Sequence, residues 1–162
     1  MLITDLGNTR RRLLATLAQI PDDRLDHAPQ PGGWTPSQII RHLYATELAT
    51  ARAIQDALEA KSEPVADLDP SVLRARITAM KPADPPSAEP LPRAELIRLL
   101  EESRFRYLQA VFNKTHESTL ATKSTVFPEL GRVSLKNLVD FIWLHESLNV
   151  ERLATFAGPA PH

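Results

Sequence analysis

The sequence contains no cysteine and only five glycines, and it carries almost no net charge. Without cysteine the chain has no disulfide bonds, no thiolate metal ligands and no cysteine nucleophile. Five glycines in 162 residues leave little material for a glycine-rich phosphate loop. Nineteen basic residues against twenty acidic ones give no electrostatic reason to expect nucleic acid or an anionic membrane as a partner.

Long apolar runs are also missing. No stretch approaches the roughly 18 apolar residues of a membrane span, and charged residues between Met1 and Arg12 interrupt the region where a signal peptide needs an apolar run. Hydrophobic residues make up 43% of the chain and charged residues 24%, as in ordinary globular proteins. We therefore expect a single cytoplasmic domain over residues 1–162, long enough to form one sizeable core.

Four segments carry the periodicity of amphipathic helices. No convincing strand pattern appears, because Thr125-Val126-Phe127 is short and Pro128 follows it at once. The sequence therefore predicts an all-α fold. The predicted helices span Thr4–Gln19, Pro36–Ala60, Pro92–Asn113 and Ser134–Phe156.

Two of these helices have clear start signals. Thr35 stands at an N-cap position, Pro36 at the first helical position and Gln38 at the third, a pattern that predicts a capping box. Ser134 is the expected N-cap of the last helix, where Val133 and Leu138 are spaced as a hydrophobic staple.

The connection between the second and third predicted helices, Lys61–Leu91, is long and contains six prolines. It has room for one short helix, Ser71–Ala79. Such a long connection is unusual in a compact domain. In a helical bundle it suits a crossover between helices that are not antiparallel neighbours, so we predict a four-helix bundle with a proline-rich crossover between helices 2 and 3.

Two histidines lie on inward-facing sides of predicted helices. His145 is at the centre of the apolar stripe of the last helix, with Asn149 one turn later and Arg152 near the helix end. His42 is at the centre of the inner face of the second helix. Its neighbours on that face are small, which indicates either a cavity or a close approach of two helices; they are Thr46, Ala49, Ala53 and Ala57.

If these two helices face each other, His42, His145 and Asn149 converge. Imidazole is a common ligand of zinc, nickel and iron, and the four-residue spacing lets His145 and Asn149 reach one ion. Asparagine is the weaker ligand because it binds through a neutral amide oxygen. A metal-free alternative is a buried hydrogen bond between His145 and Asn149.

Other side chains are assigned simpler roles. Trp143 lies opposite His145 with Val139 and Val150, an apolar outer stripe that suggests a homodimer interface or cover by the crossover. Glu47 or Glu146 is considered as a base, without a spacing argument. Solvent exposure is expected for His27, His116, His162 and the basic run Arg10-Arg11-Arg12.

A set of short stretches, Ile20–Asp22, Pro31–Ser37, Ile39–Leu43, Phe127–Leu135 and Phe141–Glu146, occurs in an order that resembles the DinB superfamily, or DinB/YfiT-like metalloproteins. The resemblance implies an up-down-down-up four-helix bundle. It also implies a divalent metal ion, here zinc or nickel, held by one histidine on the second helix and a histidine pair on the last.

This chain matches the implied ligand set at His42 and His145, whereas Asn149 stands in place of the third histidine. Phe127-Pro128 replaces the His-Pro often found before the last helix. The resemblance implies a metal-dependent thiol S-transferase using a low-molecular-weight thiol, or a related transferase or hydrolase. The alternative is a degenerate, metal-free module that binds a small ligand.

Overall fold

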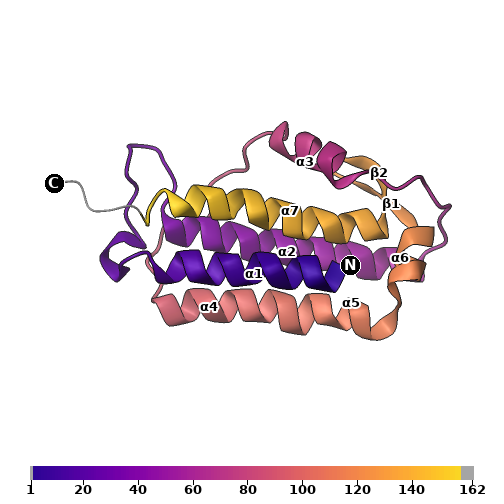
Figure 1. Cartoon of the computed structure of the whole chain (residues 1–162), viewed down its shortest axis with the longest axis horizontal. Coiled ribbons are helices and arrows are strands. Elements are labelled where there is room, and N and C mark those ends of the chain that lie inside the picture. Colours follow the sequence, from indigo (N-terminus) through magenta and orange to yellow (C-terminus); the bar gives the residue numbers. More distant parts are fainter. Residues whose placement is uncertain (1, 158–162) are drawn as a thin grey trace.

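The computed structural model describes residues 2–157 and is mainly helical (Figure 1). Four long helical rods form the predicted bundle, one of them assembled from α4, a π-helical segment and α5. The rods are α1 (Leu2–Ala18), α2 (Pro36–Glu59), α4 (Arg93–Glu101) with the π segment Glu102–Leu108 and α5 (Gln109–Lys114), and α7 (Leu135–Ala154). Shorter elements are the 3-10 turn Asp22–Arg24, α3 (Pro70–Thr78), α6 (Glu117–Thr122), β1 (Ser124–Phe127) and β2 (Gly131–Ser134).

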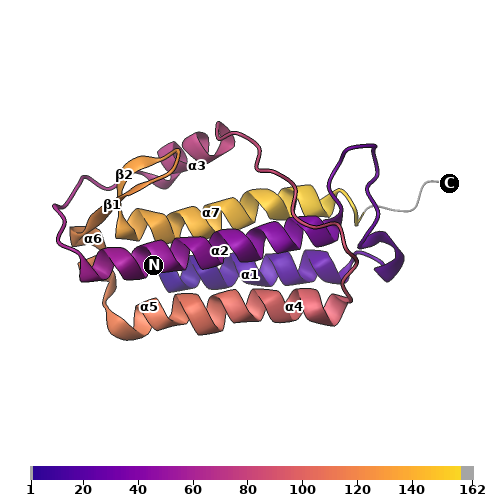
Figure 2. The same ribbon diagram turned by 180° about the vertical axis from the view of Figure 1, so that it is seen from behind.

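The chain runs in the same direction along α2 and along α4 and α5, whereas α1 and α7 run the opposite way (Figures 1 and 2). Hydrogen bonds from Tyr44 to Glu102 (2.9 Å) and from Gln55 to Tyr107 (3.5 Å) join α2 to the third rod in matching order. The proline-rich crossover connects α2 to the third rod. It runs back along the length of the bundle, and its helix α3 lies over α7.

Both helix start signals form as predicted. The Thr35 hydroxyl accepts a hydrogen bond from the Gln38 backbone N–H (3.1 Å), and the Gln38 side chain accepts one from the Thr35 N–H (2.9 Å). The Ser134 hydroxyl accepts from the Asn137 N–H (3.0 Å). These caps fix the start of α2, which carries His42, and the start of α7, which carries His145.

Helix α7 is buried on nearly all sides, which corrects the expected outer stripe. Val139 and Val150 are only 0% and 4% exposed. Val139 packs in one core cluster with Leu2 and Leu6 of α1, and Val150 in the other with α1 residues further along. The first helix of the bundle therefore covers this side of α7, and Trp143 is half-buried there, with its indole N–H donating to Asp140 (2.9 Å).

The sequence predicted no strands, and this prediction is wrong. Strands β1 and β2 form an antiparallel hairpin in which Thr125 pairs with Val133 and Phe127 with Gly131. Pro128 starts the connecting turn, and Glu129 and Gly131 have φ values of 68° and 75°. Positive φ at these two positions matches the left-handed geometry of short hairpin loops. The hairpin places Phe127 beside α7.

A buried cluster of charges joins all four rods. Arg10 of α1 contacts Glu146 of α7 (2.9 Å) and Glu47 of α2 (3.3 Å), while Arg104 of the π segment contacts Glu47 (2.8 Å) and Glu146 (3.6 Å). The four side chains balance in charge, and their residues are 2–8% exposed. The expectation for Arg10 was therefore wrong, because only Arg11 and Arg12 of the basic run are exposed.

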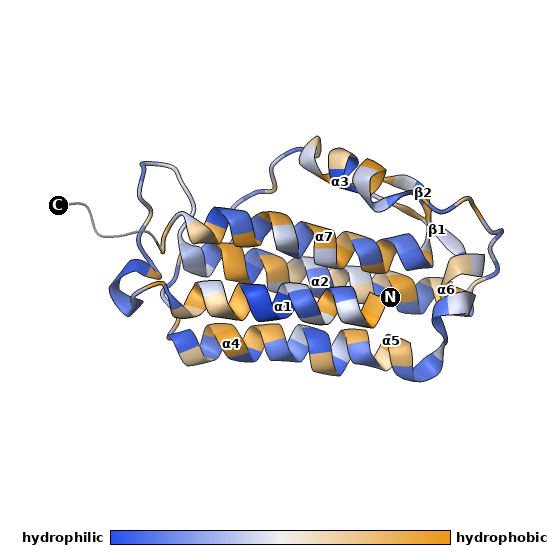
Figure 3. Cartoon of the chain, in the orientation of Figure 1, coloured by the Kyte–Doolittle hydropathy of each residue, from blue (hydrophilic) through white to orange (hydrophobic). Residues whose placement is uncertain are grey.

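Hydrophobic and hydrophilic residues alternate along the rods. Figure 3 shows hydrophobic residues along every rod of the bundle, a strongly hydrophilic band midway along α1, and a largely hydrophilic loop between α1 and α2. Among the described helices, none combines the length and apolar character needed to cross a membrane.

Candidate metal and ligand site

A pocket of about 660 Å³ lies between α2 and α7, under the crossover and the hairpin. His42 and Thr46 of α2, with the exposed Ala49, form one wall. Of the small residues predicted beside His42, Thr46 and Ala49 therefore border a cavity, whereas Ala53 is not among the lining residues and Ala57 is buried in the core. Apolar side chains make up much of the remaining lining: Ile77, Met80, Pro82, Phe127, Phe141 and Leu148.

His42 and His145 meet in this pocket. Their Nε2 atoms are 3.1 Å apart, and their ring centroids are 4.9 Å apart at an angle of 72°. Aromatic neighbours hold both rings: Phe141 stacks on His145 at 5.6 Å, and Trp34 meets His42 edge-on at 5.3 Å. The predicted convergence of these two imidazoles is therefore present.

Both imidazoles favour the neutral form. Burial lowers the pKa of His145 to about 3, with further contributions from His42 and from the charge of Arg152. Burial and the same arginine lower the pKa of His42. At neutral pH each ring therefore has a nitrogen lone pair for a metal ion or a hydrogen bond.

Asn149 lies beside the histidines, but its amide is engaged elsewhere. Its Nδ2 donates to the backbone carbonyl of His145 (2.9 Å) and lies 3.5 Å from the His145 Nε2. Its Oδ1, the atom that would bind a metal, accepts from Arg152 Nη1 (3.2 Å). Sequence reasoning placed Arg152 on this face but did not anticipate that it would occupy the Asn149 oxygen.

Comparison with known families settles the relationship of the chain. The family model of the DinB superfamily matches residues 5–152. The chain belongs to the DinB superfamily. This confirms the resemblance seen in the sequence, whereas the search of curated proteins found no match.

Two solved structures are similar to this DinB chain. The four-helix bundle protein TT2238 is 20% identical, with a TM-score of 0.63 over 95% of this chain and 96% of TT2238. YfiT from Bacillus subtilis is 16% identical, with a TM-score of 0.66 over 96% of this chain and 83% of YfiT. YfiT is described as a probable metal-dependent hydrolase with an unusual four-helix bundle topology. At these identities the likeness establishes the shared fold.

The donor geometry of the DinB site suits a divalent ion in part. Two nitrogens bound to one tetrahedral zinc at about 2.0–2.1 Å lie roughly 3.3 Å apart, close to the 3.1 Å between the Nε2 atoms. The third predicted ligand does not fit as it stands, because the Asn149 oxygen faces Arg152. Across residues 2–157, no group of three or more His, Cys, Asp or Glu side chains is arranged to hold a metal ion.

The other candidate residues of this DinB chain lie away from the pocket. Glu47 and Glu146 are held by Arg10 and Arg104 in the bundle core and do not line the cavity. Loop residues His27 and His116 are exposed, as predicted. His162 lies outside the described residues.

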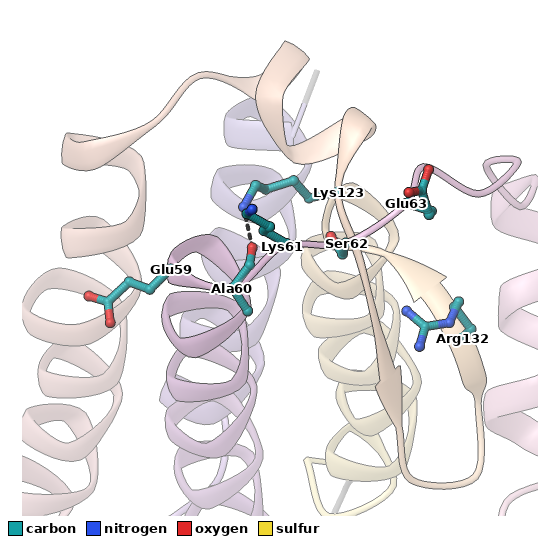
Figure 4. Close-up of a pocket in the computed structure, with 7 residues that line it drawn as sticks. All are labelled: Glu59, Ala60, Lys61, Ser62, Glu63, Lys123 and Arg132. Atoms are coloured by element: carbon teal, nitrogen blue, oxygen red, sulfur yellow. Dashed lines mark hydrogen bonds between the residues drawn. The ribbon is translucent and has the colours of Figure 1, made fainter.

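A larger surface cavity of about 890 Å³ lies at the carboxyl end of α2 (Figure 4). Lys123, which lines it, donates to the carbonyl oxygens of Leu58 (2.9 Å) and Ala60 (2.7 Å) and so caps α2. Neither histidine of the pair is among the lining residues. We therefore assign this cavity a structural role and place the chemistry in the histidine pocket.

Proposed function

We propose that this DinB protein is a metal-dependent enzyme acting on a small molecule, with zinc or nickel held by His42 and His145. The observation that carries this proposal is the 3.1 Å approach of two neutral imidazole nitrogens at the wall of a ligand-sized pocket. Membership in the superfamily and the description of YfiT as a probable metal-dependent hydrolase support it.

The reaction class is a group transfer or a hydrolysis. A bound divalent ion lowers the pKa of a thiol or water that it coordinates, so a low-molecular-weight thiol as co-substrate gives a thiol S-transferase and water gives a hydrolase. Phe141 and Trp34 fix the two imidazole rings. The catalytic base is unassigned. Glu129 is the carboxylate among the pocket residues, whereas Glu47 and Glu146 are committed to ion pairs.

Elemental analysis of protein purified without chelator or affinity tag tests this function. We expect stoichiometric zinc or nickel, lost in His42→Ala and His145→Ala and kept in the exposed-loop control His27→Ala. Metal content near zero after metal-replete purification would reject the proposal.

A metal-free module that binds a small ligand is the second candidate. It is favoured by the Asn149 amide, whose oxygen is committed to Arg152, and by the Nε2 pair, which is also within hydrogen-bonding distance. Tight zinc binding by the unmodified protein, measured by titration calorimetry, would exclude this reading.

The remaining partners are proposals of the same kind. We propose a cytoplasmic protein with no nucleic acid or membrane partner and with a homodimeric assembly. Burial of Val139 and Val150 removes the original argument for the dimer, but Phe105 on the third rod is 66% exposed and offers a different apolar contact. Sedimentation over a dilution series, with Phe105→Ser as the comparison, tests this; a strict monomer at every concentration rejects it.

A further inference from the structure

Arg152 brings a positive charge to the pocket that no carboxylate balances. Its Nη1 donates to Asn149 (3.2 Å), and its guanidinium carbon lies 5.2 Å from the centre of the Trp34 ring. These contacts orient the guanidinium but do not compensate its charge, since none of the ion pairs found within residues 2–157 includes Arg152. An arginine has five N–H donors, so most of them remain available to a ligand.

The other charges of the lining cancel. Lys81 of the crossover lines the cavity together with the carboxylate of Glu129, so the net positive charge of the lining is that of Arg152. The two histidines bring no negative charge, because an imidazole is neutral or cationic. A small anion therefore gains favourable interactions in this cavity that a neutral molecule of the same shape does not.

Much of the remaining cavity lining is apolar. Phe127 and Phe141 lie 5.4 Å apart between ring centres, and Leu148 and Met80 line the same space. A volume of about 660 Å³ is in the range of pockets for small organic ligands. The arrangement calls for a molecule with an apolar body and one charged end.

We propose that this pocket binds a small carboxylate with an apolar body, its carboxylate paired with Arg152 and its apolar part against Phe127 and Phe141. The planar guanidinium matches the two oxygens of a carboxylate and can bind both. The inference rests on the proposed function, since it assigns the substrate class of the same pocket. Asn149 acts here as a positioning residue, because it orients Arg152 through its amide oxygen.

Calorimetric titration with matched probes tests the assignment. Phenylacetate, 3-phenylpropanoate and hexanoate, each paired with its neutral amide, are titrated into the full-length protein in metal-stripped and zinc-treated forms. We expect at least one carboxylate to bind about tenfold or more tightly than its amide, as for a hydrogen-bonded charge pair. Arg152→Gln removes this preference and Arg152→Lys keeps part of it. Arg74→Gln removes the same charge from α3 outside the pocket and changes nothing.

Equal affinity for every acid and its amide, failure of all six probes to bind, or a preference that persists in Arg152→Gln overturns the inference. Circular dichroism of each variant shows whether it is folded. The metal proposal fails separately, through absent zinc in elemental analysis, because the acid–amide comparison is also made in the metal-stripped protein.

Discussion

The amide of Asn149 determines how many ligands the histidine pocket offers a metal ion. Its nitrogen donates to the His145 carbonyl and its oxygen accepts from Arg152. Reversing the amide would set oxygen against a carbonyl oxygen and an NH₂ group against a guanidinium, so both hydrogen bonds would be lost. The unmodified site therefore offers a metal ion two imidazole ligands and leaves its other coordination positions open.

Replacing this side chain gives the first prediction. Asn149→His supplies a third imidazole and releases Arg152, so zinc affinity should rise by about tenfold or more. Competition titration against a zinc chelator measures the change. Asn113→His, at an exposed position in α5, adds a histidine without completing the site and serves as the control. Unchanged zinc affinity in Asn149→His would show that the ring cannot reach the pair.

The buried imidazoles predict a pH dependence of stability in metal-stripped protein. The pKa of His145 is lowered from 6.5 to about 3, so between these values the unfolded chain binds a proton that the native chain does not. The contribution of neutral His145 to the free energy of unfolding is therefore fully present above pH 6.5. It is lost as the pH falls, by at most about 1.4 kcal/mol per pH unit. Urea denaturation at several pH values measures this.

His145→Gln should flatten that dependence, whereas His27→Gln in the exposed loop should leave it unchanged. If the free energy of unfolding changes with pH equally in the wild type and in His145→Gln, the pH dependence does not come from His145.

Sequence periodicity was sufficient to place His42 and His145 on inward-facing sides of their helices, because the face of a regular helix follows from residue spacing. Their meeting was predicted only on the condition that the two helices face each other, and the structure meets that condition.

The hydrogen bond between the Asn149 oxygen and Arg152 could not be predicted from residue spacing. It depends on Arg152 being held over Trp34, a ring that is distant in sequence and reaches the site through the loop before α2. The ion pairs of Glu47 and Glu146 likewise require all four rods to be in place.

At the scale of elements, the hairpin shows where local reasoning fails. Pro128 was interpreted as the end of an isolated extended stretch, although it begins a turn. Glu129 adopts a φ of 68°, which is uncommon for a residue other than glycine and gives no clear signal in the sequence. The bundle helices were predictable because caps and periodicity are local. The π segment was not, since its buried Arg104 bonds to Glu47 of α2 and to the Leu6 carbonyl of α1, which are distant in sequence.

Replacing glycine by alanine should have opposite effects on stability at two positions. Gly131 has a φ of 75° at the hairpin, so Gly131→Ala should destabilise the protein by about 1 kcal/mol. Gly7 lies inside α1, where an added methyl group meets no atom within 4 Å, and Gly7→Ala should stabilise it by about 0.5–1 kcal/mol. Thermal denaturation measures whether each variant melts above or below the wild type. Melting temperatures shifted in the same direction in both variants would contradict this account.

At the scale of the whole molecule, the buried charge cluster ties the four rods into one register. Removing one member leaves an opposite charge buried without its partner, so Glu146→Gln should cost about 3–5 kcal/mol. Urea denaturation measures this loss. The exposed pair of Arg74 and Glu151 provides the control, since Glu151→Gln removes a surface ion pair of little energetic value.

The same reasoning predicts recovery when the charges are removed together. A variant in which Arg10, Glu47, Arg104 and Glu146 are all replaced by apolar residues of similar volume should be far less destabilised than the single variant, because no buried charge is left unpaired. Equal losses in the two variants would indicate that the cluster contributes through packing alone.

The crossover forms part of the pocket mouth without belonging to the bundle. Met80, Lys81, Pro82 and Ala83 border the cavity, and the segment is tied to α2 where Gln38 donates to the Pro86 carbonyl (2.9 Å). If the pocket binds a substrate as proposed, substitutions of Lys81, Pro82 or Ala83 would alter which molecules enter it. These three residues lie outside both hydrophobic core clusters, whereas Met80 packs against one of those clusters, so selectivity and folding depend on different residues of one segment.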